Sequence, residues 1–204
     1  YNVEDLFDTV HDEGKNDWTF MPKSKAKQAE CRKVKSYYRK QECQETDWNE
    51  ERLAIKLSQI KDVLLKERKV LPEILALVEI ENENVISKLA KVLGYKNYIV
   101  SNSPDKRGID LAMLYNDSPK FNFVGKREIT INADYFKKRP TRNILEVEFV
   151  VDKKYPLYLF VNHWPSLGNP DSARVAAATT LKARIEEISK TNKNYHAIAM
   201  GDFN

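Results

Sequence analysis

Hydrophobic residues recur with a helical period just after residue 50. They are spaced four, three and four residues apart, at Leu53, Leu57, Ile60 and Leu64. This spacing places them on one face, so the pattern predicts an amphipathic helix that ends before Pro72. Asp47 followed by Glu50 is typical of a capping box at the start of such a helix.

Two further helices are indicated by the same kind of pattern. Residues 84–93 read as a helix and are followed by Gly94, a residue typical of a helix C-terminus. Residues 172–189 place Leu181, Ile185 and Ile188 on one face.

Strand patterns dominate the rest of the chain. Residues 74–80 (ILALVEI) are nearly all apolar, which is typical of a strand covered on both faces. Other strand-like runs, separated by turn-forming residues, cover 1–7, 97–101, 109–115, 121–124, 127–131, 144–151, 157–161 and 196–200. The order of elements predicts sheet packed on sheet with helices on the outer faces. These patterns alone are compatible with an α/β or an α+β fold, as one large domain or two small ones.

The composition is that of a globular domain, since 42% of the 204 residues are hydrophobic, 31% are charged and the formal net charge is +4. No apolar run is long enough to span a bilayer. Cys31 and Cys43 are the two cysteines, which excludes a disulfide-rich scaffold and a cysteine-rich zinc or iron–sulfur site. They either form one bridge or remain free thiols, so the redox compartment stays open.

Residues 11–46 carry the least regular pattern of the chain and a strong local charge. Within residues 23–40, eight basic residues stand against one acid, Glu30, which leaves a local charge of +7. This basic insertion fits a solvated, mobile loop. Because Tyr37 and Tyr38 lie among the basic residues, it also fits a surface that follows a phosphate backbone and stacks bases. A steep loss of binding with salt would favour the second interpretation.

Polar side chains lie at the ends of several apolar strands, where burial is costly unless they are paired or functional. They are Asn2, Glu4, Glu79, Glu81, His163, Asp202 and Asn204. Each has an ordinary structural explanation alone: a carboxylate–lysine pair, a core histidine or an Asx turn. Together they supply carboxylates, amides and a histidine, which are the groups needed for metal-assisted attack on a phosphate ester.

Five segments carry a resemblance to a known family. They are YNVEDLFD (1–8), LVEIEN (77–82), RGIDLAMLY (107–115), NHWPS (162–166) and GDFN (201–204). In this order they resemble the motifs of the endonuclease/exonuclease/phosphatase superfamily, which has the deoxyribonuclease I-like fold. The resemblance spans the chain from end to end, and the order of five motifs makes it far more specific than any one of them. It implies one α+β domain (an α/β sandwich) over residues 1–204, with two packed mixed sheets flanked by helices and a basic insertion at about residues 11–46.

The resemblance also implies roles for individual residues. Glu79 would be the principal Mg²⁺ ligand, with Asn2 beside the metal and the scissile phosphate; Mn²⁺ and Ca²⁺ are alternative ions. His163 would hydrogen-bond the phosphate, Asp202 would orient or activate the attacking water, and Asn204 would contact the phosphate and the metal shell.

Five further positions match the family less directly. Asp110 is expected to be a catalytic residue that supports the other residues of the site rather than contacting the substrate itself. The candidate substrate-binding residues are Arg107, Arg142, Arg174 and Asn162. For the three arginines, a surface ion pair is the alternative.

The chain also departs from the family pattern. The family carries a further Ser-Asp-His-like motif beyond the GDFN segment, and this chain ends before it. Neither His11 nor His196 fits that role, because one follows the first strand and the other opens the last. We therefore expect a fragment truncated at both ends and incomplete at the C-terminus, with an incomplete site, an exposed sheet edge and no activity of its own.

The leading functional hypothesis is a Mg²⁺-dependent phosphodiesterase or endonuclease that hydrolyses nucleic acid by in-line attack of water. The alternatives are a phosphomonoesterase, a phosphodiesterase of phospholipids or sugar phosphates, and a non-catalytic binding protein on the same fold. The full set of strand-end residues argues against the last. We expect a monomer with no membrane span and DNA or RNA as a possible partner; localisation stays open between the cytoplasm and secretion.

Overall fold

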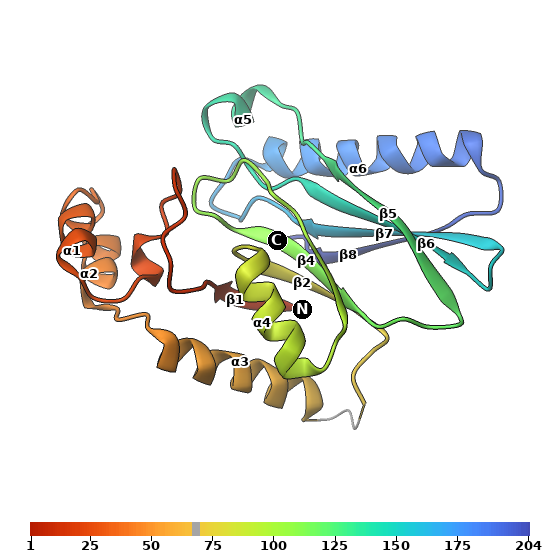
Figure 1. The fold of residues 1–204 in the computed structure, drawn as a ribbon. Coiled ribbons are helices and arrows are strands. Elements are labelled where there is room, and N and C mark those ends of the chain that lie inside the picture. The colour runs from red at the N-terminus through yellow and green to blue at the C-terminus, as the bar shows by residue number, and fades with distance from the viewer. Residues whose placement is uncertain (67–69) are drawn as a thin grey trace.

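In the computed structural model, which describes residues 1–66 and 70–204, the strands form two four-stranded sheets (Figure 1). The first sheet has the order β1-β2-β4-β3, in which β1 runs parallel to β2 and the other pairs are antiparallel. Its strands are β1 (Asn2–Leu6), β2 (Ile74–Ile80), β3 (Asn97–Val100) and β4 (Asp110–Tyr115). The strand predicted over residues 74–80 is therefore confirmed.

The second sheet has the order β5-β6-β7-β8, with β7 and β8 parallel. Its strands are β5 (Phe121–Ile129), β6 (Ile144–Val151), β7 (Tyr155–His163) and β8 (His196–Asp202). The prediction of two separate strands over 121–124 and 127–131 was wrong. A register shift between Phe123 and Gly125 lets β5 bend while it stays paired with β6, so one bulged strand replaces two.

A hydrophobic core fills the space between the two sheets. On β6, the alternate residues Leu145, Val147 and Phe149 enter this core, as expected for side chains that share one face of a strand. Val78 of β2 and Met113 of β4 meet them from the first sheet. The predicted arrangement of two mixed sheets packed face to face is confirmed.

Helices cover the outer face of each sheet (Figure 1). They are α3 (Glu50–Leu65) and α4 (Glu83–Leu93) on the first sheet, and α5 (Asp134–Lys138) and α6 (Asp171–Thr191) on the second. The predicted start of α3 was wrong, because the side chain of Asn49, not Asp47, accepts the hydrogen bond from the amide of Arg52. Helix α5 was not predicted, since it is only five residues long and buries a single side chain, Phe136.

The basic insertion is more regular than its pattern indicates. It contains the short 3₁₀ helix η1 (Trp18–Phe20) and the helices α1 (Lys25–Arg32) and α2 (Tyr37–Glu45). The expectation of an irregular segment was therefore wrong for these ranges. The two helices bury only Lys27, Cys31 and Cys43, so the sequence lacks the stripe of large apolar residues from which a helix is predicted. We refer to residues 23–45 as the hairpin arm.

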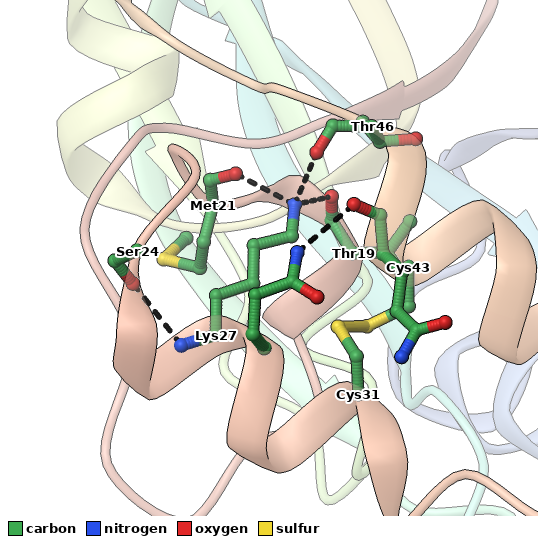
Figure 2. The surroundings of a disulfide bond; sticks show 9 residues. Thr19, Met21, Ser24, Lys27, Cys31, Cys43 and Thr46 are labelled. Carbon is green, nitrogen blue, oxygen red and sulfur yellow. Dashed lines mark hydrogen bonds between the residues drawn. A yellow bond between two sulfur atoms is a disulfide. The ribbon is translucent and has the colours of Figure 1, made fainter.

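The hairpin arm is held together by a disulfide and a buried lysine (Figure 2). Cys31 of α1 and Cys43 of α2 form the bridge, which decides the question that their spacing left open. The Nζ of Lys27 donates hydrogen bonds to the backbone carbonyls of Thr19 (2.9 Å), Met21 (2.7 Å) and Thr46 (2.7 Å). Lys27 is fully buried, and its ammonium group connects α1 to the residues before it, Thr19 and Met21, and to Thr46 after α2.

The last strand, β8, has one neighbour, β7, within the described ranges, and its first four residues are exposed. The expectation of an exposed sheet edge agrees with this arrangement. Of the helices in the described part of the chain, none combines the length and the apolar character that crossing a membrane requires.

Candidate functional site

The ends of four strands bring polar side chains to one place between the two sheets. In the first sheet, the parallel pairing of β1 with β2 sets Asn2 opposite Val78, next to Glu79. In the second sheet, the parallel pairing of β7 with β8 sets His163 directly opposite Asp202. Because the parallel strands β7 and β8 end at the same edge, they bring His163 and Asp202 to one rim. In the first sheet it is the start of β1, at Asn2, that meets the end of β2 near Glu79.

Hydrogen bonds connect these groups across the two sheets. The Nδ2 of Asn2 donates to Glu79 Oε1 at 3.1 Å and to Asp202 Oδ2 at 3.2 Å. The Nε2 of His163 lies 3.5 Å from Glu79 Oε1. The backbone amide of Asp5 donates to the second oxygen of Glu79 at 2.9 Å. The structure therefore brings Asn2, Glu79, His163 and Asp202 into a single cluster.

Glu79 enters the cluster because β2 carries a bulge at this position. The pairing with β4 shifts register between Val78 and Ile80, and Glu79 has a backbone φ of 68°. Val78 lies in the core between the sheets, whereas Ile80 lies in the core under the helices. Because of the bulge, the side chain of Glu79 does not follow the alternation of β2 between the two cores. A non-glycine residue in this conformation costs on the order of 1–3 kcal/mol, a strain that functional sites commonly store.

The cluster lies on a cavity of about 500 Å³, which we call the site cavity. Its acidic lining residues are Glu79, Asp105 and Asp202, and His163 and Asn204 also line it. Its basic lining residues are Arg39, Lys106, Arg107, Lys138, Arg139 and Arg142. Since basic side chains outnumber acidic ones, the site cavity suits an anionic ligand.

Arg107 and Arg142 share a carboxylate partner that the sequence did not reveal. Asp105 pairs with Arg107 at 2.8 Å and with Arg142 at 3.4 Å. Burial opposes the ionisation of Asp105, but the hydrogen bonds and charge of Arg107 outweigh it, and the pKa of the carboxyl is lowered overall. Both arginines are therefore ion-paired and line the site cavity. The pair of Arg107 is partly exposed, whereas that of Arg142 is buried and is not the surface ion pair given as the alternative.

His163 is held in its neutral form at physiological pH. Its side chain is 8% exposed, and burial, reinforced by the charge of Arg142, lowers its pKa to about 4. Its Nδ1 is buried and has no hydrogen-bond partner among the described residues. A neutral imidazole carries one N–H, and the nearby Glu79 carboxylate favours placing it on Nε2.

Gly201 allows β8 to approach β7 closely beside the site. Its φ is 127°, and a Cβ at this position would lie 2.0 Å from the carbonyl oxygen of Asn162. Asn204 then turns back toward the site: its amide donates to Asp202 Oδ1 at 3.0 Å, and its Nδ2 donates to the carbonyl of Trp164 at 2.9 Å. The Asx turn considered for this motif is present, and it orients Asp202.

Four predicted residues lie outside the lining of the site cavity: Asn2, which belongs to the hydrogen-bonded cluster, and Asn162, Asp110 and Arg174, which do not. Asn162 is fully buried; its Nδ2 donates to Phe160 O at 2.9 Å, and its Oδ1 accepts from Trp164 Nε1 at 3.0 Å. Asp110 is also buried and accepts from Ser101 Oγ at 2.7 Å. Both side chains hold the backbone near the site.

Arg174 also faces its own chain. It donates to the carbonyls of Pro165 (3.4 Å), Ser166 (3.0 Å) and Asn169 (3.4 Å), and it pairs with Asp171. It thereby braces the loop that follows His163 rather than lining the site cavity. This is the ion-pair alternative that we considered for Arg174.

The sequence pattern missed several residues of the site. Asp5, Asp105, Lys106, Lys138 and Arg139 were not singled out, and Arg39 was placed only in the basic insertion. Burial, reinforced by the charge of Glu79, raises the pKa of Asp5 to about 6, and its Oδ1 is buried without a partner among the described residues. Asp5 lies within the motif YNVEDLFD, so the sequence held a signal for this carboxyl group. The burial of Asp105 leaves no signal in the sequence.

The donor set fits a hard divalent cation bound with few protein ligands. The described residues contain no group of three His, Cys, Asp or Glu side chains arranged to hold a metal ion. Mg²⁺ commonly uses one or two carboxylates, water and substrate phosphate, so it does not require such a group. The oxygen-rich surroundings, with the unpartnered buried Asp5 Oδ1 beside Glu79, favour a hard cation over a thiophilic one.

Comparison with known sequences gives one family. Residues 1–204 match the profile of a family described as the Endonuclease/Exonuclease/phosphatase family. A search of curated proteins found no match.

Solved structures of similar fold include truncated TDP2 of Caenorhabditis elegans, with 20% identity, a TM-score of 0.56, and coverage of 72% of this chain and 56% of that one. The human Nocturnin catalytic domain with bound sulfate shows 19% identity, a TM-score of 0.54, and coverage of 72% and 55%. A mannosyl-6-phosphatase of Bacteroides thetaiotaomicron shows 19% identity, a TM-score of 0.54, and coverage of 72% and 57%. These identities establish the fold alone. This chain spans little more than half the length of each of the three.

Proposed function

Because this chain belongs to the endonuclease/exonuclease/phosphatase family, we propose that the protein is a divalent-metal-dependent phosphoesterase that hydrolyses phosphodiesters of nucleic acid. The family contains nucleases and phosphatases, so membership supports hydrolysis of phosphate esters as the reaction class. The finer assignment to a nucleic-acid phosphodiesterase rests on the chemistry of the site cavity.

One observation carries the proposal. Asn2, which opens β1, donates hydrogen bonds to both Glu79 and Asp202, and His163 lies 3.5 Å from the same Glu79 carboxylate. A carboxylate cluster of this kind repels itself unless a cation or donors compensate it. Its position in a cavity with six basic lining residues supports a site in which a phosphate ester meets a cation.

In the proposed mechanism, the scissile phosphate lies between the basic lining residues and the strand ends. Arg107 and Arg142 donate to the non-bridging oxygens, and their shared partner Asp105 keeps both guanidinium groups in place. His163, neutral and with its proton on Nε2, donates a hydrogen bond to the phosphoryl oxygen as negative charge develops there.

Asp202 is the proposed acceptor for the proton of the attacking water. The Asx turn with Asn204 restricts its orientation, and Asn2 donates to its other oxygen. A carboxylate held by two donors can orient a water molecule in line with the leaving group.

The cation belongs beside Glu79 in this proposal. Glu79 would hold a divalent ion such as Mg²⁺, whose charge, when it is bound, stabilises the phosphoryl oxygens. Asn2 contributes by ordering the Glu79 carboxylate, since its own Oδ1 already accepts from the amide of Glu4 at 2.8 Å. Mn²⁺ and Ca²⁺ accept the same oxygen ligands and are alternatives.

The experiment that tests this function is an assay of the full-length protein on bis-p-nitrophenyl phosphate, in Mg²⁺ and in EDTA. We expect turnover that requires the cation, and slower hydrolysis of the monoester p-nitrophenyl phosphate. Equal or faster hydrolysis of the monoester would favour a phosphomonoesterase. No turnover by protein shown to be folded would overturn the proposal in favour of a non-catalytic binding protein.

A further inference from the structure

We infer that the hairpin arm binds single-stranded nucleic acid and leads it into the site cavity. This inference rests on the proposed function, because it identifies the substrate class of the same site. It arises from three features of residues 23–45 that phosphodiester hydrolysis alone does not require: their charge, their exposed aromatic pair and their rigid attachment.

The arm presents a strongly positive surface. Residues 23–45 contain eight basic residues and three acids, Glu30, Glu42 and Glu45. Its exposed basic side chains are Lys23, Lys25, Arg32, Lys33, Lys35 and Arg39. Of these, only Lys33 forms an ion pair with a carboxylate in the described part of the chain. Basic side chains without carboxylate partners are available to neutralise phosphates.

Three of these basic residues surround a groove on α1. Lys23, Lys25 and Arg32 line a cavity of about 540 Å³, together with Ser24, Gln28 and Ala29. The lining contains no carboxylate. Its size and its lining suit the phosphates of a flexible chain.

The arm also exposes two neighbouring aromatic rings. Tyr37 is 72% exposed and Tyr38 is 81% exposed, and their ring centroids lie 5.6 Å apart at an interplanar angle of 81°. Exposed rings flanked by basic residues are typical of surfaces on which unpaired bases stack. Bases in a duplex already stack on each other, so this pair favours a single strand.

The arm is continuous with the site cavity through helix α2. Tyr37 and Tyr38 open this helix, and Arg39, the next residue, lines the site cavity together with Glu79 and His163. A strand whose bases stack on the tyrosines therefore has a phosphate contact at Arg39 on its way to the cluster. Figure 1 shows α1 and α2 at the side of the molecule toward which β1 points, beyond the loop that follows this strand.

The arm is rigid enough to act as a preformed surface. The Cys31–Cys43 disulfide joins its two helices, and Lys27 fastens α1 to the carbonyls of Thr19, Met21 and Thr46 (Figure 2). A surface that is ordered before binding loses less conformational entropy when the ligand arrives. A solvated, mobile loop, the other interpretation of this segment, would not be expected to carry these two restraints.

The binding test uses the full-length protein in EDTA, with fluorescein-labelled dT20 and the dT20·dA20 duplex as probes and fluorescence anisotropy as the readout. We expect Tyr37→Ala/Tyr38→Ala to weaken dT20 binding by at least about fivefold, because the substitutions remove the two aromatic rings on which bases stack. Tyr37→Phe/Tyr38→Phe should retain binding. The matched control is Tyr155→Ala, which removes an exposed tyrosine from β7, outside the arm.

Salt dependence tests the charged groove independently. Lys25→Ala/Arg32→Ala should reduce the slope of log Kd against log[KCl] by about 1.4, because each lost phosphate contact on a single strand accounts for ~0.7. An unchanged slope, equal affinity for duplex and single strand, or full dT20 binding by the double Tyr→Ala variant would each overturn the inference.

Hydrolysis of bis-p-nitrophenyl phosphate separates this inference from the proposed function. Neither tyrosine lines the site cavity, so turnover of this small substrate should stay within about twofold in the double Tyr→Ala variant. If the small substrate were turned over but dT20 binding did not depend on the tyrosines, the role of the hairpin arm would be wrong and the phosphoesterase assignment would stand. Tyrosine-dependent dT20 binding without any turnover would defeat the phosphoesterase alone.

Discussion

The side-chain amide of Asn2 and the carboxylate of Asp202, 200 residues apart in the chain, are joined by a hydrogen bond of 3.2 Å. Asn2 opens the first strand of one sheet and Asp202 closes the last strand of the other. The same amide donates to Glu79, so one small side chain connects the candidate metal ligand with the candidate base. The site therefore lies where the edges of the two packed sheets meet.

Glu79→Gln is expected to weaken Mg²⁺ binding and to reduce turnover by about 10²–10³-fold, since it removes the charge that would hold the cation. Calorimetric titration with Mg²⁺ and a bis-p-nitrophenyl phosphate assay measure the two effects. Glu73→Gln is the matched control, because Glu73 is exposed and its ion pair with Lys120 lies just before β2. Equal loss in both variants would contradict the assignment.

His163→Ala is expected to lower turnover by about 10²–10³-fold and to leave Mg²⁺ affinity nearly intact, because the imidazole acts on the phosphate. His196→Ala serves as the control, since this exposed histidine lies at the opposite end of β8. If the His163→Ala protein turned over substrate as fast as the parent, the assignment of the site would be wrong.

Asp105→Asn is expected to destabilise the fold by about 3–5 kcal/mol, because it leaves the buried guanidinium of Arg142 without its charged partner. Urea denaturation measures this change in the free energy of unfolding. Asp134→Asn breaks an exposed pair with Lys137 instead and should cost less than about 1 kcal/mol. A loss below that level at Asp105 would show that Arg142 does not depend on it.

Gly201→Ala is expected to destabilise the protein by at least about 2 kcal/mol, because the added Cβ would lie 2.0 Å from Asn162 O. The parallel pair β7–β8 would have to separate next to the site. Gly168→Ala is the control: its Cβ would meet no atom within 4 Å, so its effect should stay within about 0.5 kcal/mol. Thermal unfolding of both variants compares them directly.

Lys27 is expected to make stability depend on alkaline pH. Burial lowers its pKa from 10.5 to about 8, so between these values the unfolded chain binds a proton that the folded chain does not. The contribution of Lys27 to the free energy of unfolding therefore rises with pH across this window, by at most about 3 kcal/mol. Below pH 8 both states are protonated and the contribution is constant.

The measurement compares the parent with Lys27→Met by urea denaturation between pH 7 and pH 10.5. The free energy of unfolding of the parent, minus that of Lys27→Met, should increase as pH rises. A difference that stayed flat across the window would show that the ammonium keeps its ordinary pKa in spite of burial, through its three carbonyl acceptors.

Local periodicity determined much of the architecture from the sequence alone. The stripe from Leu53 to Ile60 became the buried face of α3, and the apolar run 74–80 became β2 in the middle of a covered sheet. Side-chain burial repeats with the period of the element, so these patterns survive in the sequence. The five motifs likewise determined the family, because each holds its residues at fixed local spacing.

Tertiary structure alone decided the groups that act together. Glu79 reaches the cluster through a bulge against β4, and Asp105 is shared by two arginines. The Cys31–Cys43 bridge and the Lys27 ammonium organise an arm that has no stripe of large apolar residues. All of these depend on contacts between residues distant in the chain or on burial created by packing. No local pattern encodes such contacts, because their free energy arises only when the sheets and helices come together.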